Sequence, residues 1–441
     1  MMRFFVSLFL SAFAFVAMLP AASAMNIEKI VSPAGIEAWL VREQAVPLVT
    51  LNYAFHGGST QDPAGKAGTA NLAADLLDEG AGELDGQTYH ERLENHAIEL
   101  SFQVGRDEFH GSLRSLNEHR EEAFDLLRLA LTAPRFEPDA VERVRRQEIS
   151  GLQRETTNPN NIASRRWWAT AFPDHPYGRE TKGTLESVPT IAAGDLREYV
   201  RRVFARNELT ISIVGDVDAK TAGELIDRAF AKLPARNDLK PVANATPAGL
   251  GRRIVVNLDV PQAVVTFGGL GLARNDPDFM AGYIVNHILG GGSFSSRLYK
   301  EVREKRGLAY GVSDSLVWFK RAAVVIGGTA TRADRTGEAL AIIEAETKRM
   351  ADSGPTEDEL AAAKSYLKGA YVLSLDTSAK IAAQLTQIQL DNLGIDYMQR
   401  RSAMIDAVTI DDARRVAKRL FGGGMLVTVV GRPKGLASSG E

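Results

Sequence analysis

The sequence predicts an α+β fold of two homologous halves, each a mainly antiparallel sheet covered on one face by helices, arranged as a clamshell. Three observations predict it: a repeated strand–turn–helix pattern, two matching terminal strands, and long amphipathic helices between them. The chain has 441 residues, which is too long for one ordinary hydrophobic core.

The two halves open with the same order of elements. A strand-like run at 48–55 is followed by an Asp-Pro turn at 62–63 and an apolar helical segment. A second run at 263–269 is followed by an Asp-Pro turn at 276–277 and another helical segment. Self-similarity at so long a period indicates a duplicated domain.

The halves also end alike, because the runs 209–215 and 426–431 both alternate as half-buried strands do and both close on glycine. Between these landmarks the helical period predicts long amphipathic helices at 117–132, 137–156, 333–351 and 355–374.

A stretch rich in turn-forming residues, 235–252, is the predicted linker between the halves. We therefore expect one domain at 25–234 and its structural repeat at 253–435.

Residues 1–24 have the pattern of a secretory signal peptide. Arg3 precedes an apolar run, and Ala22 and Ala24 supply a small-residue cleavage pattern, so the mature chain is expected to begin at Met25. A retained membrane anchor is the alternative, but the run is short and no charged stop follows it. In a Gram-negative host the expected destination is the periplasm, with no stable membrane insertion after the signal is removed.

The composition excludes some kinds of chemistry and argues against one class of partner. The chain contains no cysteine, so disulfides, a cysteine nucleophile and thiolate ligands of zinc are excluded. A net charge of −3 and a pI of about 6.2 argue against a nucleic-acid partner.

The strongest local signal is the segment 293–310, which reads SFSSRLYKEVREKRGLAY. It resembles the second-half signature of the pitrilysin family, which includes insulin-degrading enzyme and mitochondrial processing peptidase. The segments HPYG at 175–178, Gly183-Thr184 and FARN at 204–207 resemble first-half segments of the same family.

In that family the first-half helix carries the inverted zinc motif H-x-x-E-H, in which two histidines bind zinc and the glutamate activates water. Here the Gly-Lys-Ala-Gly turn is kept at 65–68, but Asn71 and Asp75 replace the histidines and Ala74 replaces the glutamate. Glu148 falls where the resemblance places the third ligand. We expect no metal or other cofactor on this chain; the alternative is a hard-cation site formed by Asn71, Asp75 and Glu148.

The seven histidines offer no substitute for the lost motif. His90 and His96 are six residues apart and point to different faces of a helix, so surface or capping roles are expected for this residue type.

The second half contains a residue pair that resembles another part of the family's active site. Arg303 and Tyr310 match, in identity and spacing, a family pair that reaches the zinc site from the second half. The resemblance implies that the tyrosine stabilises the oxyanion and the arginine holds substrate carbonyls. Alternatively, Arg303 caps a helix that stops at Gly307, and Tyr310 packs at the edge of the next strand.

Gly290, Gly291 and Gly292 resemble a shorter form of the glycine-rich loop of the non-catalytic subunit of mitochondrial processing peptidase, which implies a role in substrate binding. A flexible turn between helices is the alternative.

Together these features predict a non-catalytic, substrate-binding and oxyanion-stabilising subunit of an exported heterodimeric zinc metallopeptidase. The expected partner is an active homologue that carries H-x-x-E-H and the zinc, and the expected substrates are peptides. Two alternatives stay open: an inert binding or scaffold protein of the same fold, and a free-standing peptidase with a rearranged metal site.

Overall fold

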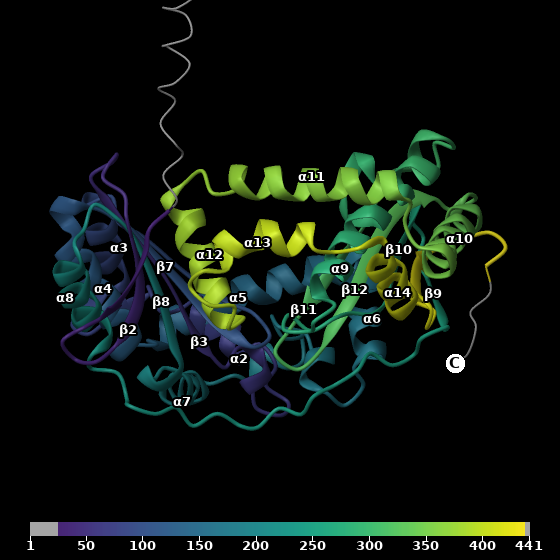
Figure 1. The fold of residues 1–441 in the computed structure, drawn as a ribbon. Coiled ribbons are helices and arrows are strands. Elements are labelled where there is room, and N and C mark those ends of the chain that lie inside the picture. Colours follow the sequence, from purple (N-terminus) through teal and green to yellow (C-terminus); the bar gives the residue numbers. More distant parts are fainter. Residues whose placement is uncertain (1–24, 437–441) are drawn as a thin grey trace, which may run out of the picture.

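The computed structural model describes residues 25–436, which form two lobes lying side by side (Figure 1). Each lobe is built on one main sheet. The predicted signal segment 1–24 lies outside the described residues. Within 25–436 there is no helix that combines the length and apolar character needed to span a bilayer.

The first sheet has six strands in the order β1-β2-β8-β3-β7-β6, and all neighbours are antiparallel except β2 and β8. Its strands are β1 (Ile27–Val31), β2 (Glu37–Arg42), β3 (Leu48–His56), β6 (Glu99–Val104), β7 (Glu108–Leu116) and β8 (Leu209–Gly215).

The second sheet repeats this topology without a counterpart of β1. Its order is β11-β12-β10-β13-β9, and again only one neighbouring pair, β13 and β9, is parallel. The predicted duplication and the α+β class are therefore confirmed. The strands are β9 (Arg253–Asn257), β10 (Gln262–Leu270), β11 (Ala309–Trp318), β12 (Ala323–Arg332) and β13 (Leu426–Gly431).

Helices follow the strands in matching order in the two halves. The four long helices expected from periodicity correspond to α4, α5, α10 and α11. The first half contains α2 (Thr69–Ala74), α3 (Gly86–Asn95), α4 (Arg120–Thr132), α5 (Pro138–Glu155), α6 (Pro159–Ala171), α7 (Ala193–Val203) and α8 (Ala219–Phe230). The second half contains α9 (Phe279–Asn286), α10 (Thr336–Ser353), α11 (Glu357–Leu373), α12 (Ser378–Leu390), α13 (Tyr397–Asp406) and α14 (Ile410–Phe421).

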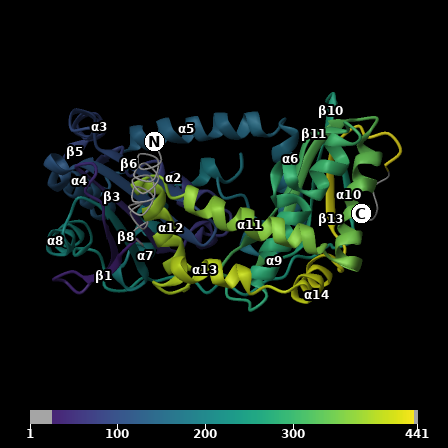
Figure 2. The same cartoon turned by 45° about the horizontal axis from the view of Figure 1, so that its top comes forward.

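One helix of each half crosses to the sheet of the other half. Figure 2 shows α6 against the second lobe and α12 against the first. The indole Nε1 of Trp167 on α6 donates a hydrogen bond to the Leu426 carbonyl oxygen at 3.0 Å. On α12, Gln389 Nε2 donates to Ser212 Oγ at 2.8 Å. This exchange is a feature that the predicted fold class did not include: each sheet has a second apolar face, which a helix of the other half covers.

Residues 235–252, the predicted linker, run without helix or strand from one lobe to the other along the lower edge of Figure 1. Backbone hydrogen bonds hold this segment to the second lobe: Ala245 N donates to Arg321 O at 2.8 Å, and Gly251 N donates to Met425 O at 2.9 Å.

Candidate functional site

The helix α2, which carries the positions of the zinc motif, is fixed at its start by the Asp-Pro turn. Asp62 accepts hydrogen bonds from the backbone N–H groups of Gly68 at 2.7 Å and Ala70 at 2.8 Å. Burial raises the pKa of Asp62 to about 7, although these hydrogen bonds favour its charged form. Gly68 has a positive φ of 95°, and a Cβ there would meet the Lys182 carbonyl oxygen at 2.6 Å, so only glycine fits.

The side chains at the motif positions bond to one another. Asn71 Nδ2 donates to Asp75 Oδ2 at 2.9 Å, and the Asp75 carboxyl shares a hydrogen bond with Glu148 of α5. Ala74 is buried. Packing around the Asp75 carboxyl, and then the charge of Glu148, raise the pKa of Asp75 to about 7, although the residue remains accessible to solvent.

This set of side chains does not fit a catalytic zinc ion. An amide that donates to a carboxylate, and two carboxyl groups linked by a hydrogen bond, are poor substitutes for two neutral imidazoles. Alanine at position 74 has no group that can accept a proton from water. Across residues 25–436 the structure contains no group of three or more His, Cys, Asp or Glu side chains arranged to hold a metal. The residues of the alternative cation site, Asn71, Asp75 and Glu148, do converge, and two hydrogen bonds through Asp75 link them to one another.

The second-half pair forms a stack at the start of β11. The guanidinium carbon of Arg303 lies 4.7 Å from the ring centre of Tyr310 and 4.9 Å from that of Tyr299. Tyr310 is 87% exposed. The alternative in which Tyr310 is a packed edge residue is therefore wrong, since its ring contacts Arg303 and otherwise faces solvent.

The backbone around the pair explains this exposure. Arg303 lies on a short π-helix, η8 (Tyr299–Glu304), where an ordinary amphipathic helix was expected. The turn after it closes when Gly307 N donates to Arg303 O at 2.8 Å with Gly307 at a φ of 60°, as the predicted helix stop requires. The register of β11 and β12 then shifts between Ala309 and Val312, which is a bulge containing Tyr310. Bulges re-aim side chains and occur often beside functional sites.

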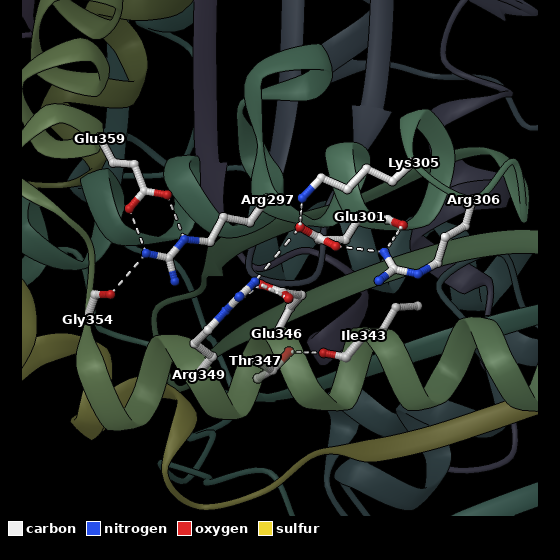
Figure 3. Close-up of polar contacts among 10 residues, drawn as sticks. All are labelled: Arg297, Glu301, Lys305, Arg306, Ile343, Glu346, Thr347, Arg349, Gly354 and Glu359. Atoms are coloured by element: carbon white, nitrogen blue, oxygen red, sulfur yellow. Dashed lines mark hydrogen bonds and ion pairs between the residues drawn. The ribbon is translucent and has the colours of Figure 1, made fainter.

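Arg297 anchors this segment to α11, a role that the sequence analysis did not assign. Its Nε and Nη2 donate to the two carboxylate oxygens of Glu359 at 2.7 and 2.6 Å, and Nη2 also donates to the Gly354 carbonyl oxygen (Figure 3). Such a bidentate pair fixes direction as well as distance. The arginine in the signature SSRLY was the only sequence signal for it.

Glu301 forms ion pairs with three neighbouring cations but not with Arg303. It accepts hydrogen bonds from Lys305 and Arg306, each at 2.6 Å, and lies 4.0 Å from Arg349 (Figure 3). The bonds from Lys305 and then Arg306 lower the pKa of Glu301. Arg303 has no carboxylate partner within residues 25–436, so its charge is available to a group outside the chain.

The three glycines are not an open loop. Gly290 and Gly291 lie in a second π-helix, η6 (His287–Gly291), and Gly292 follows it. A Cβ on Gly290 would lie 2.6 Å from Asp314 Oδ1, so this glycine is needed for close packing, and it is buried. Gly291, by contrast, is exposed. The buried position of Gly290 does not support its predicted contact with substrate.

The HPYG segment holds the two halves together. Tyr177 Oη donates to Asp107 Oδ2 at 2.6 Å and accepts from the backbone N–H of Arg321 at 3.0 Å. The backbone N–H of Lys320 donates to the same Asp107 oxygen at 2.8 Å. This first-half motif therefore fixes the β11–β12 turn of the second half.

The two predicted groups do not form one site in a single chain. Among the described residues no hydrogen bond, ion pair or ring contact joins Asn71, Asp75 or Glu148 to Arg303 or Tyr310. In Figure 1, α2 lies in one lobe and β11 in the other. The histidines are also dispersed: His90 hydrogen-bonds its own helix at Gly86 O, and His96 stacks on His119.

The fold and the site together define a class: a duplicated α+β peptidase fold whose metal-binding helix lacks metal ligands. The chain belongs to the M16 (insulinase) peptidase family, as the resemblance implied. Residues 40–185 match the model described as insulinase (peptidase family M16), and residues 190–367 match the one described as peptidase M16 inactive domain.

Individual relatives include proteins named as peptidases and one named as a non-peptidase. The non-peptidase homolog YmxG of Helicobacter pylori is 27% identical, over 86% of each chain. An uncharacterized zinc protease of Streptomyces coelicolor is 26% identical, over 92% of this chain and 90% of its own. A crystal structure described as a peptidase M16 inactive domain from Pseudomonas fluorescens matches with a TM-score of 0.87 and 26% identity, over 94% of this chain and 99% of its own. The substitutions at Asn71, Ala74 and Asp75 identify this chain as an inactive member of the family.

Proposed function

We propose that this chain is the non-catalytic subunit of an exported zinc peptidase pair, in which it binds peptide substrates and stabilises the oxyanion. The main support is a contrast between two sets of side chains. Those on α2 hydrogen-bond to one another or to Glu148, whereas the Arg303–Tyr310 stack presents Tyr310 to solvent. A tyrosine that is 87% exposed on a bulge stabilises little within its own chain.

The chemistry of the stack suits a developing oxyanion. The Tyr310 hydroxyl donates a hydrogen bond, and the cation of Arg303 lies against the same ring and favours negative charge nearby. Arg303 also offers a planar fork of N–H donors to a substrate carbonyl. The partner subunit would supply the zinc and the base, which this chain lacks. Such a division requires the two chains to face each other across the substrate.

The position of β11 supports peptide binding. β11 is an edge strand of the second sheet, so among residues 25–436 no strand pairs with its outer side, although the N–H of Leu316 donates to Asn286 Oδ1 at 3.0 Å. An extended peptide that adds to this edge would be bound mainly through its backbone. Its carbonyl groups would then pass the bulge that presents Tyr310.

Export to the periplasm is the other part of the proposal. It rests on the apolar segment and small-residue cleavage pattern of residues 1–24 and on the absence of cysteine.

The proposal is tested by producing the mature chain together with an H-x-x-E-H homologue from the same genome. We expect peptidase activity to require both chains, and the two to co-elute as a heterodimer. A homologue that is equally active alone would contradict the proposal and favour the scaffold alternative. Full activity of this chain alone, with about one tightly bound zinc per chain, would favour the free-standing peptidase.

The role of Arg303 is separated from general charge effects by a matched pair of variants. Arg303→Ala should lower the kcat/KM of the pair, whereas Arg332→Ala, which removes an exposed arginine of β12, should leave it unchanged. Equal effects of the two variants would show that only overall charge matters.

A further inference from the structure

A cavity in the second half lies beside α9 and α11, which the internal repeat relates to α2 and α5, the helices that carry the vestigial zinc positions. In the first half, α2 packs against α5 and α7; in the second half, α9 packs against the equivalent helices α11 and α14, and also against α13, which has no α-helical counterpart among the described residues of the first half. The cavity is lined by α9, α11, α12 and α13 and by Trp318 of β11, and its volume of about 460 Å³ is within the range of small-molecule sites.

The lining is rich in aromatic residues and carries a net positive charge. Its charged side chains are Arg274, Asp391 and Arg401. Asp391 is satisfied by Trp318 Nε1, which donates at 3.1 Å, and by Arg274, whose Nε lies 3.8 Å away. These contacts leave one arginine charge in excess. Six aromatic rings complete the wall: Phe279, Tyr283, Trp318, Tyr366, Tyr371 and Tyr397.

The burial and the contacts of Arg401 are the evidence for a bound ligand. It is only 6% exposed, yet within residues 25–436 it makes no ion pair, and its hydrogen bond to the Leu367 carbonyl oxygen at 3.0 Å uses one of five N–H donors. Its guanidinium carbon lies 4.2 Å from the ring centre of Tyr371, a cation–π contact that holds it at the cavity wall. The Tyr371 hydroxyl is itself buried without a hydrogen-bond partner. The other N–H donors of Arg401 have no partner among residues 25–436 and line the cavity, so an anion bound there would gain charge-assisted hydrogen bonds.

We propose that this cavity binds a carboxylate attached to an apolar or aromatic body, with Arg401 receiving the carboxylate and the aromatic wall receiving the body. Guanidinium matches a carboxylate with two parallel hydrogen bonds. Both the C-terminal residue of a peptide and a free small acid have this chemistry. The site does not depend on the proposed pairing with a zinc peptidase.

The test is isothermal titration of the mature chain with N-acetyl-phenylalanine and with its amide. The acid should bind saturably, and the amide about 10-fold or more weakly, because it lacks the charged partner of Arg401. A short peptide ending in phenylalanine, with and without C-terminal amidation, distinguishes the sources. Binding of the free-acid peptide indicates capture of a peptide C-terminus, whereas binding of the single residue alone indicates a small acid. Equal affinity of the acid and the amide would overturn the proposal.

Two variants locate the site. Arg401→Gln should weaken binding of the acid about 10- to 100-fold. Should that variant fail to fold, Ala370→Phe provides the second arm, because it fills the cavity from α11 and leaves Arg401 in place. Ala361→Phe adds the same ring to an exposed position of α11 away from the cavity and should bind the acid normally. Unchanged binding in Ala370→Phe would overturn the assignment.

Discussion

The two halves of this chain share a topology but differ in what has happened to their chemistry. In the first half the metal-binding helix is intact as a helix. Its two ligand positions hold Asn71 and Asp75, which bond to each other and, through Asp75, to Glu148, and Ala74 stands at the position of the base. In the second half Arg303 stacks on Tyr310 without a carboxylate partner among residues 25–436, and Tyr310 is exposed to solvent. The cluster on α2 satisfies itself, and the Arg303–Tyr310 stack does not.

This difference is informative because the two sets of side chains differ in what they contribute to their own chain. An exposed tyrosine on a bulge and an arginine without a carboxylate partner contribute little to folding. Their retention beside an anchored scaffold of Arg297, Glu301 and Glu359 suggests a function outside the chain. The lost motif and the kept pair therefore fit one subunit of a shared site better than a generally decayed enzyme.

The contrast between the halves can be tested by rebuilding the zinc motif in the first half. The triple change Asn71→His, Ala74→Glu and Asp75→His rebuilds H-x-x-E-H on α2, with Glu148 in reach as third ligand. We expect zinc content after dialysis to rise from none to about one ion per chain, since imidazole replaces amide and carboxyl groups. The control, Asn71→Gln with Ala74→Glu and Asp75→Gln, adds similar bulk without imidazole and should stay free of zinc. Equal zinc content in both variants would show that α2 is no longer placed to bind a metal.

Two glycines of the second half provide another test, in which the measured quantity is the free energy of unfolding. Gly290→Ala should lower the free energy of unfolding by about 1–3 kcal/mol, because its Cβ would press on the buried Asp314 carboxyl and backbone. Gly291→Ala, whose Cβ would meet nothing closer than 3.2 Å, should cost less than about 1 kcal/mol, since alanine also favours helix. Urea unfolding of both variants measures this, and equal losses would contradict the assigned packing role of Gly290.

The smallest expected effect is on the pH dependence of stability, to which Asp75 of α2 contributes. The pKa of Asp75 is raised on folding to about 7 from an unfolded value near 4, so the folded chain binds a proton that the unfolded chain has lost. The contribution of this group to stability therefore falls as pH rises from about 4 to about 7. Asp75→Asn should flatten that part of the profile by less than about 1 kcal/mol, because water screens the site.

Urea midpoints at about pH 5 and about pH 8 check this prediction. Glu94→Gln, which removes an exposed carboxylate from α3, serves as control. A pH profile that becomes steeper in Asp75→Asn would contradict the assigned shift.

Much of the fold could be predicted from the sequence, because strand alternation and helical period report burial directly. The matched strands 209–215 and 426–431 and the long helices were predicted in this way. The exchange of α6 and α12 was not, since an amphipathic pattern shows that a helix covers something but not which sheet it covers. Trp167 therefore gave no sign that it would pack on Leu426, far along the chain.

The candidate site was predicted unevenly for similar reasons. Arg303 and Tyr310 were identified from a resemblance, but the bulge that exposes Tyr310 depends on the pairing of β11 with β12. Gly290 was interpreted as a loop residue, because glycine needed for close approach to Asp314 looks the same in sequence as glycine in a flexible turn. Arg401 was missed, since its environment comes from three helices distant in sequence.

The most direct test of the shared-site account is the activity of the reconstituted pair carrying Tyr310→Phe in this chain. Loss of one hydroxyl that donates to the oxyanion should lower kcat/KM about 100- to 1,000-fold. The unfolding midpoint of this chain should stay the same, because Tyr310 is 87% exposed. Unchanged kcat/KM in the Tyr310→Phe pair would contradict the account and leave this chain a binding partner without a part in hydrolysis.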